Sequence, residues 1–197
     1  AYIEEEYGAA TPAERALLSA STLWAAIVGQ LSCGFLADQF GRKTMFIITV
    51  CLITIGSLMS ALYFGNAGSV YIWVPVCRIV MGLGIGGEYP LSASVASKSV
   101  PPRLRGRMLA IIFAGQGCGA LLATLVFFIC NAAGASAGFT WRFALAFGTI
   151  PTIVAAILRA FMKAYKWAIL GTALSWFLLD VSFYGNSLFS SEIGKGE

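Results

Sequence analysis

The chain has 197 residues, of which 58% are hydrophobic and 11% charged, and its mean hydropathy is +0.81. Soluble domains carry about 25% charged residues, so this composition excludes a mostly water-facing surface and argues against a soluble enzyme. The sequence contains no histidine, which removes the commonest metal ligand and the usual general base. We therefore expect no catalytic residue, no metal and no cofactor.

Apolar stretches of about 20 residues, the length that crosses a bilayer, recur along the whole chain. They predict six spanning helices with short connections, so neighbouring helices should be antiparallel. In chain order the predicted spans are Ala16–Ala37, Thr44–Phe64, Tyr71–Ser97, Met108–Asn131, Thr140–Met162 and Tyr165–Ser190. The five cysteines fall inside these stretches without CxxC spacing, which is typical of buried thiols.

The charges in the connections alternate between the two sides of the predicted bundle. One side has nine basic residues and the other has three: Arg42, Lys43, Lys98, Arg103, Arg105, Arg107, Arg159, Lys163 and Lys166 against Arg15, Arg142 and Lys195. The positive-inside rule places the nine in the cytoplasm and both given chain ends on the extracellular side. The net charge of +4 then reflects topology, so we expect a lipid bilayer and no nucleic acid as partner.

Three ionisable residues lie inside predicted spans, namely Arg78, Glu88 and Asp180. A charge at the bilayer centre costs about 2.5–3.5 kcal/mol on insertion scales, so it must be paired, solvated or protonated. Either a substrate or proton site or a helix-packing ion pair would satisfy this requirement. Counted from the cytoplasmic ends, Glu88, Gln116 and Trp176 all lie at a depth of about 13–15 Å, near the midplane.

Trp176, Asp180 and Tyr184 are spaced i, i+4 and i+8, which places them on one helix face. A carboxylate between two aromatic rings is a poor surface for lipid, so this face should line an interior cavity. Desolvation disfavours the charged carboxylate, so Asp180 could bind a proton together with an anion and release both. The pattern therefore predicts a proton-coupled carrier.

The segment from Gly82 to Gly87 matches GxGxxG, the dinucleotide-binding fingerprint. That fingerprint needs a strand–turn–helix context, whereas these glycines lie inside a predicted span. We interpret them, with Gly115, Gly117 and Gly119 on the next span, as sites of close helix approach. No GxxxxGK[ST] motif occurs, so nothing in the chain indicates ATP as the energy source.

The segment Gly34–Lys43 (GFLADQFGRK) resembles the loop between the second and third helices of the major facilitator superfamily. Arg103–Gly106 (RLRG) is similar to that superfamily's next cytoplasmic loop. The resemblance implies a cytoplasmic gate motif made of Gly34, Asp38, Gly41, Arg42, Lys43 and Arg105.

Three further segments resemble the phosphate:proton symporter family within that superfamily: Gly84–Ser92, Phe113–Gly117 and Trp176–Tyr184. This resemblance implies uptake of inorganic phosphate driven by protons, in the plasma membrane. It places the phosphate site at Tyr89, Gln116, Trp176, Asp180 and Tyr184. The resemblance also links three residues to proton movement, namely Asp180, Glu88 and Arg78.

The resemblance covers the family's helices two to seven and implies an all-α transmembrane fold that is incomplete, with the first helix and helices eight to twelve absent. Residues 1–162 would form the N-terminal bundle, and residues 163–197 a short cytoplasmic link and the first helix of the C-terminal bundle. The family usually has aspartate where this chain has Glu88, and glutamate also occurs there in glycerophosphodiester permeases. A glycerophosphodiester or organophosphate:proton symporter, a transceptor, and an inactive or regulatory truncated fragment remain the alternatives.

Overall fold

The computed structural model describes residues 2–99 and 101–161. All regular structure in these residues is helical. The helices are α1 (Tyr2–Tyr7), α2 (Pro12–Phe40), α3 (Arg42–Ala61), α4 (Ala67–Ser99), a 3₁₀ turn η1 (Pro102–Leu104), α5 (Arg105–Ala132) and α6 (Ala137–Phe161). The sixth predicted span, with Trp176, Asp180 and Tyr184, lies outside the described residues.

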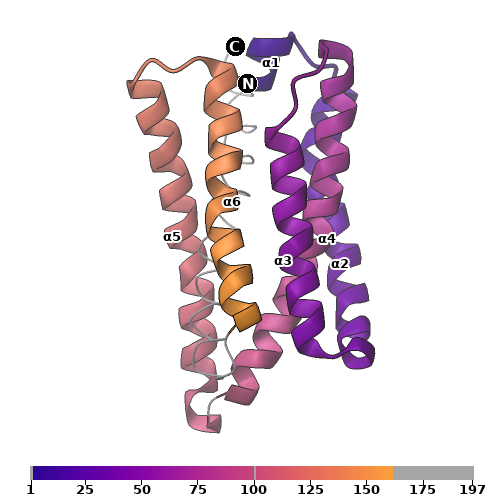
Figure 1. Ribbon diagram of the computed structural model, residues 1–197, viewed down its shortest axis with the longest axis vertical. Coiled ribbons are helices and arrows are strands. Elements are labelled where there is room, and N and C mark those ends of the chain that lie inside the picture. Colours follow the sequence, from indigo (N-terminus) through magenta and orange to yellow (C-terminus); the bar gives the residue numbers. More distant parts are fainter. Residues whose placement is uncertain (1, 100, 162–197) are drawn as a thin grey trace.

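The long helices run back and forth between two ends of the molecule (Figure 1). The short helix α1 and the connections α3–α4 and α5–α6 lie at one end, here called the α1 end. The connections α2–α3 and α4–α5 lie at the opposite end, together with the basic residues Arg42, Lys43, Arg103, Arg105 and Arg107. The predicted alternation of the connections is therefore confirmed for this part of the chain.

Four of the described helical segments are long and apolar enough to cross a membrane, and they coincide with the first four predicted spans: Pro12–Phe40, Arg42–Ala61, Gly68–Ser94 and Pro102–Ala132. The fifth predicted span coincides with α6, whose 25 residues give it a length of about 37 Å. That α6 crosses the membrane remains a prediction. Most helices extend a few residues beyond the apolar stretch, because polar helix ends can project past the hydrocarbon.

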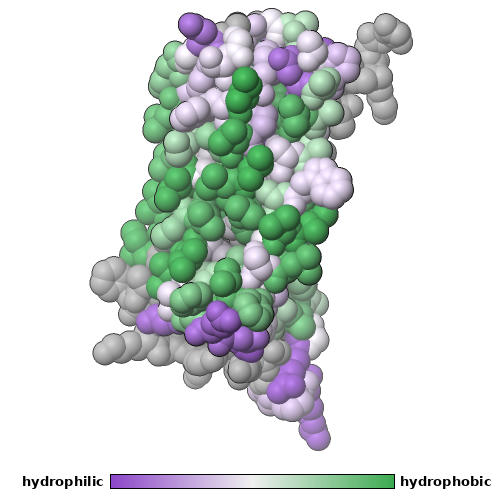
Figure 2. All heavy atoms as spheres, turned by 90° about the vertical axis from the view of Figure 1, so that its right-hand side faces the viewer, coloured by the Kyte–Doolittle hydropathy of each residue, from purple (hydrophilic) through white to green (hydrophobic). Residues whose placement is uncertain are grey.

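The outer surface of the bundle is apolar around its middle. Figure 2 shows hydrophobic side chains covering the central part of one face and hydrophilic side chains gathered near both ends. On α2, Trp24, Leu31 and Phe35 are 70%, 75% and 66% exposed. So many exposed large apolar residues suit a lipid environment, and the helices satisfy their backbone polar groups internally. The chain is an integral, multi-pass membrane protein.

The parallel helices α2 and α4 pack closely because α4 presents glycines to the α2 backbone. A Cβ on Gly82 would lie 2.5 Å from the Thr22 carbonyl oxygen, and a Cβ on Gly86 would clash with the Ala26 carbonyl. On another face of α4, a Cβ on Gly84 would lie 2.6 Å from the α3 carbonyl oxygen of Thr49. The GxGxxG match is thus a packing motif, as predicted. For Gly117 on α5 the prediction fails among the described residues, since a Cβ there would meet no atom within 4 Å.

Two of the five cysteines do not have the predicted burial. Cys33, Cys77 and Cys130 are buried, whereas Cys51 and Cys118 are exposed on the outer faces of α3 and α5. An apolar stretch shows that a residue lies at membrane depth, but not whether it faces protein or lipid. Because a thiol behaves as a small apolar group, both surroundings accept it.

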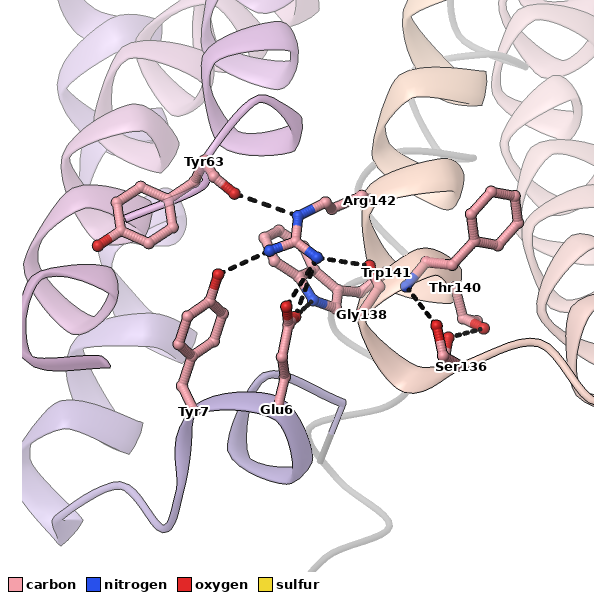
Figure 3. Close-up of polar contacts among 9 residues, drawn as sticks. Glu6, Tyr7, Tyr63, Ser136, Gly138, Thr140, Trp141 and Arg142 are labelled. Atoms are coloured by element: carbon pink, nitrogen blue, oxygen red, sulfur yellow. Dashed lines mark hydrogen bonds and ion pairs between the residues drawn. The ribbon is translucent and has the colours of Figure 1, made fainter. Parts of the chain in front are cut away.

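At the α1 end, a polar network centred on Arg142 of α6 connects neighbouring helices (Figure 3). The Arg142 guanidinium pairs with the Glu6 carboxylate at 2.8 Å. It also donates to the Tyr63 carbonyl at 3.1 Å and to the Tyr7 hydroxyl at 2.6 Å. The indole of Trp141 donates to Glu6 at 2.7 Å. The network therefore joins α1, the end of α3 and α6.

The aromatic residues around Arg142 strengthen this network. The guanidinium carbon lies 4.6 Å from the Trp141 ring centroid and 5.1 Å from that of Phe64, which are cation–π distances. Burial raises the pKa of the Tyr7 phenol, and this outweighs the opposing effect of the Arg142 charge. The Tyr7 hydroxyl therefore stays neutral and serves as an acceptor for Arg142.

Candidate functional site

Arg78 and Glu88, which lie in the apolar part of α4, face different neighbours. Arg78 is 8% exposed and Glu88 is fully buried at 0%. Ten residues of helix separate them, which is about 15 Å along the axis. Arg78 donates to the carbonyl of Leu18 on α2, whereas Glu88 contacts Thr49 on α3. Arg78 and Glu88 therefore do not form an ion pair with each other.

The Arg78 guanidinium is only partly satisfied in its buried position. Its Nη1 has the Leu18 carbonyl as acceptor, while its Nε has no hydrogen-bond partner in the described part of the chain. The hydroxyl of Ser21, one helical turn from Leu18 on α2, is also buried without a partner there. Unsatisfied buried polar atoms are rare and often mark functional positions. This region of the α2–α4 contact is therefore polar, although it lies within spanning helices.

Glu88 lies where α2 and α3 both pack against α4. The Thr49 hydroxyl is 3.1 Å from Glu88 Oε2, and both residues are 0% exposed. The preceding residue, Gly87, lets the helices approach, because a Cβ there would lie 2.5 Å from Cys33 Sγ on α2 and 2.7 Å from Thr49 Cγ2. The carboxyl group is thus enclosed by packed helices and not exposed to lipid.

Tyr89 and Gln116 belong to the contact between α4 and α5. Tyr89 is half-buried and packs against Ile85 on its own helix and against Ile112 on α5. Gln116 follows Ile112 by one turn on the same face of α5 and is also half-buried. The structure therefore brings Tyr89 close to the part of α5 that carries Gln116. Because successive helical residues point about 100° apart, Tyr89 faces α5 while Glu88 faces α3.

The predicted cytoplasmic gate motif surrounds the tight break between α2 and α3. Gly41 has φ +85°, a conformation that residues with a side chain rarely adopt, and it ends α2. Asp38 and Arg42 face each other across this break at 3.8 Å, and the Asp38 side chain is 75% exposed. Such an exposed pair contributes about 0–1 kcal/mol. Lys43 and Arg105 are exposed, and Gly34 has open space around its Cβ position.

The sequence pattern predicts neither the contact of Thr49 nor the Arg142 network. Thr49 lies inside an apolar stretch, where a single threonine gives no periodic or charge signal. Its spacing from Phe46 and Ile53 on the buried face of α3 is the one pattern that could have identified it. Trp176, Asp180 and Tyr184, the remaining predicted site residues, lie outside the described residues.

Comparison with known proteins identifies related sequences. The profile of the Major Facilitator Superfamily matches residues 1–184. The low affinity inorganic phosphate transporter 1 of Petunia hybrida is 30% identical, over 94% of this chain and 48% of its own length. Inorganic phosphate transporter 1-2 of Oryza sativa subsp. japonica is 28% identical, over 94% of this chain and 49% of its own length. No solved structure matches the chain.

The chain spans about half the length of the curated relatives it matches. The aligned region of the Petunia protein is 258 residues long, whereas 94% of this chain is about 185 residues. About 70 residues of the relative within that region therefore have no equivalent in this chain. The profile match includes all of the described helical bundle, from α1 to α6. The chain belongs to the Major Facilitator Superfamily.

Proposed function

We propose that the chain supplies the N-terminal bundle and the first helix of the second bundle in a proton-coupled carrier of inorganic phosphate. The observation that carries this proposal is the fully buried carboxyl group of Glu88 inside a spanning helix, next to Tyr89 at the α5 contact. A buried ionisable residue in a membrane helix is costly and marks a substrate or ion path by default.

In such a carrier, proton binding and phosphate binding use different faces of α4. Toward α3, Glu88 binds and releases a proton, and Arg78 toward α2 adds a positive charge on the same helix. Toward α5, Tyr89 and Gln116 offer hydroxyl and amide groups for the phosphate oxygens. Trp176, Asp180 and Tyr184 complete the phosphate site from the seventh helix, and Asp180 binds a proton together with the anion.

Transport proceeds by alternating access, in which two helix bundles rock around a site near the midplane. The close α2–α4 packing supports this, because a bundle must move as a rigid body. The basic end of the molecule faces the cytoplasm and the α1 end faces outward, in the plasma membrane. The gate motif around Gly41 then lies where the cytoplasmic ends of the bundles meet.

Inorganic phosphate is favoured over glycerophosphodiesters because the curated relatives are named inorganic phosphate transporters. Competition tests this choice directly. Uptake of radiolabelled phosphate into proteoliposomes that contain the full-length protein should be reduced by unlabelled phosphate but not by a glycerophosphodiester at equal concentration. If the glycerophosphodiester competed more strongly than unlabelled phosphate, the preferred substrate would be the glycerophosphodiester and not phosphate.

Proton coupling is tested with the Asp180→Asn variant, which keeps the size of the side chain but cannot titrate. Uptake driven by an inward proton gradient should be abolished while the amount of protein in the membrane is unchanged. Undiminished uptake by this variant would refute the role of Asp180. Ligand binding without accumulation in the wild type would favour a transceptor or an inactive fragment.

A further inference from the structure

The Thr49 hydroxyl lies between two possible acceptors. Its Oγ1 is 3.1 Å from Glu88 Oε2 on α4 and 3.1 Å from the Phe46 carbonyl on its own helix. A hydroxyl carries one O–H donor and can also accept. Thr49 therefore cannot donate to both groups at once, and which one receives its hydrogen depends on whether Glu88 is ionised or protonated.

With Glu88 ionised, the carboxylate can only accept, so its hydrogen bond with Thr49 requires the threonine O–H to point toward Oε2. The Phe46 carbonyl retains its helical bond from the amide four residues later within α3. With Glu88 protonated, the new carboxyl O–H donates to Thr49 Oγ1, and the threonine O–H rotates toward the Phe46 carbonyl. The incoming proton stays on Glu88; the hydrogen bond between the two side chains reverses its direction, and no covalent bond of Thr49 breaks.

The burial and charge of the surroundings favour Thr49 for this role. Both side chains are 0% exposed, so bulk water does not supply the alternating partner. From α2, the titratable group near Glu88 is Cys33, whose thiol lies against the adjacent Gly87 and is a poor donor and acceptor. On α4 itself, Arg78 is about 15 Å away along the axis. The arginines of α5 at its first turn, Arg105 and Arg107, are exposed at the end of the bundle.

We propose that Thr49 is a positioning residue for the proton step, a hydroxyl that satisfies Glu88 in both protonation states and links its proton occupancy to the α3–α4 contact. This inference rests on the proposed proton-coupled function. It predicts that a hydroxyl is required at position 49, whereas the size and shape of the side chain are not sufficient.

The test compares Thr49→Val, which keeps the shape, with Thr49→Ser, which keeps the hydroxyl. Loss of a donor to a charged group disfavours the ionised form, so the pH of half-maximal proton-driven uptake should rise by about one unit in Thr49→Val. Thr49→Ser should retain the wild-type pH profile. Phosphate exchange without net proton movement should be similar in all three proteins. An unchanged pH profile in Thr49→Val, or an equal shift in Thr49→Ser, would overturn the proposal.

Two further measurements keep the outcomes distinct. If Glu88→Gln leaves proton-driven uptake intact, the proposed function of Glu88 fails. If Glu88→Gln abolishes this uptake while Thr49→Val has the wild-type pH profile, only the role of Thr49 fails.

Infrared spectroscopy of the purified full-length protein tests the hydrogen bond without transport. The carboxyl band lost in Glu88→Gln should shift in Thr49→Val and not in Thr49→Ser, and an unshifted band in Thr49→Val would refute the contact.

Discussion

Arg78 and Glu88 lie on one helix, about 15 Å apart along its axis, and each contacts a different neighbouring helix. The two charges therefore do not neutralise each other directly, and each must be explained by its own surroundings. Arg78 lies against the backbone of α2, and Glu88 lies against the hydroxyl of Thr49 on α3. In the proposed carrier, this separation places the proton-binding carboxyl and the positive charge at different depths in the membrane.

Replacing Arg78 distinguishes a functional from a packing role. Arg78→Gln removes a buried charge that is only partly satisfied, so the free energy of unfolding should change by no more than about 1 kcal/mol. Proton-driven phosphate uptake should be lost. The measurements are thermal unfolding of the purified protein and uptake into proteoliposomes. A large loss of stability with normal uptake would assign Arg78 to packing.

The glycine contacts between α2 and α4 make a sharp stability prediction. Gly86→Ala places a methyl group against the Ala26 carbonyl and should destabilise the protein by about 1–3 kcal/mol, because packed helices cannot separate without losing other contacts. The matched control is Gly106→Ala, at an exposed position with open space around it. Thermal unfolding in detergent should show a lower midpoint only for Gly86→Ala. Equal midpoints would contradict the close approach.

The Arg142 network should stabilise the α1 end more than the nearby Glu4–Arg15 pair does. The side chain of Arg142 is 18% exposed and that of Arg15 is 51% exposed. Arg142→Lys keeps the charge but cannot reach the same set of acceptors, and should cost about 1–3 kcal/mol.

The control for this prediction is Arg15→Lys, which changes a half-exposed arginine that pairs with Glu4 and should cost less than about 1 kcal/mol. Both variants are compared by thermal unfolding, and hydrogen exchange of the α1 backbone reports where the structure opens. Faster exchange in α1 is expected for Arg142→Lys alone. Similar exchange in both variants would mean that the network does not hold α1.

The orientation can be tested with two introduced cysteines. Asn66 lies in the exposed α3–α4 connection at the α1 end, and Arg103 lies in the exposed connection at the other end. Asn66→Cys should react with a membrane-impermeant maleimide in intact cells, whereas Arg103→Cys should react only after permeabilisation. The parent protein, with its five native cysteines, gives the background. The reverse pattern would invert the topology.

The sequence predicted the first four membrane helices correctly because apolar length and loop charge are local signals. It also predicted that Gly82 and Gly86 serve packing, since small residues inside a span have few other uses. It did not predict the Glu6–Arg142 pair, which joins residues 136 positions apart, or the contact of Thr49 with Glu88. Such contacts depend on which helix faces meet. For the same reason, apolar position alone did not distinguish the buried Cys33 from the exposed Cys51.

In the proposed function, the buried carboxyl of Glu88 carries a proton while phosphate is transported. This role is tested most directly by recording lumenal pH in proteoliposomes when phosphate is added outside, for the wild type and Glu88→Gln. Wild-type vesicles should acidify as phosphate enters, and Glu88→Gln vesicles should not, although phosphate exchange continues. Equal acidification by the two proteins, or phosphate entry into wild-type vesicles without acidification, would contradict the account.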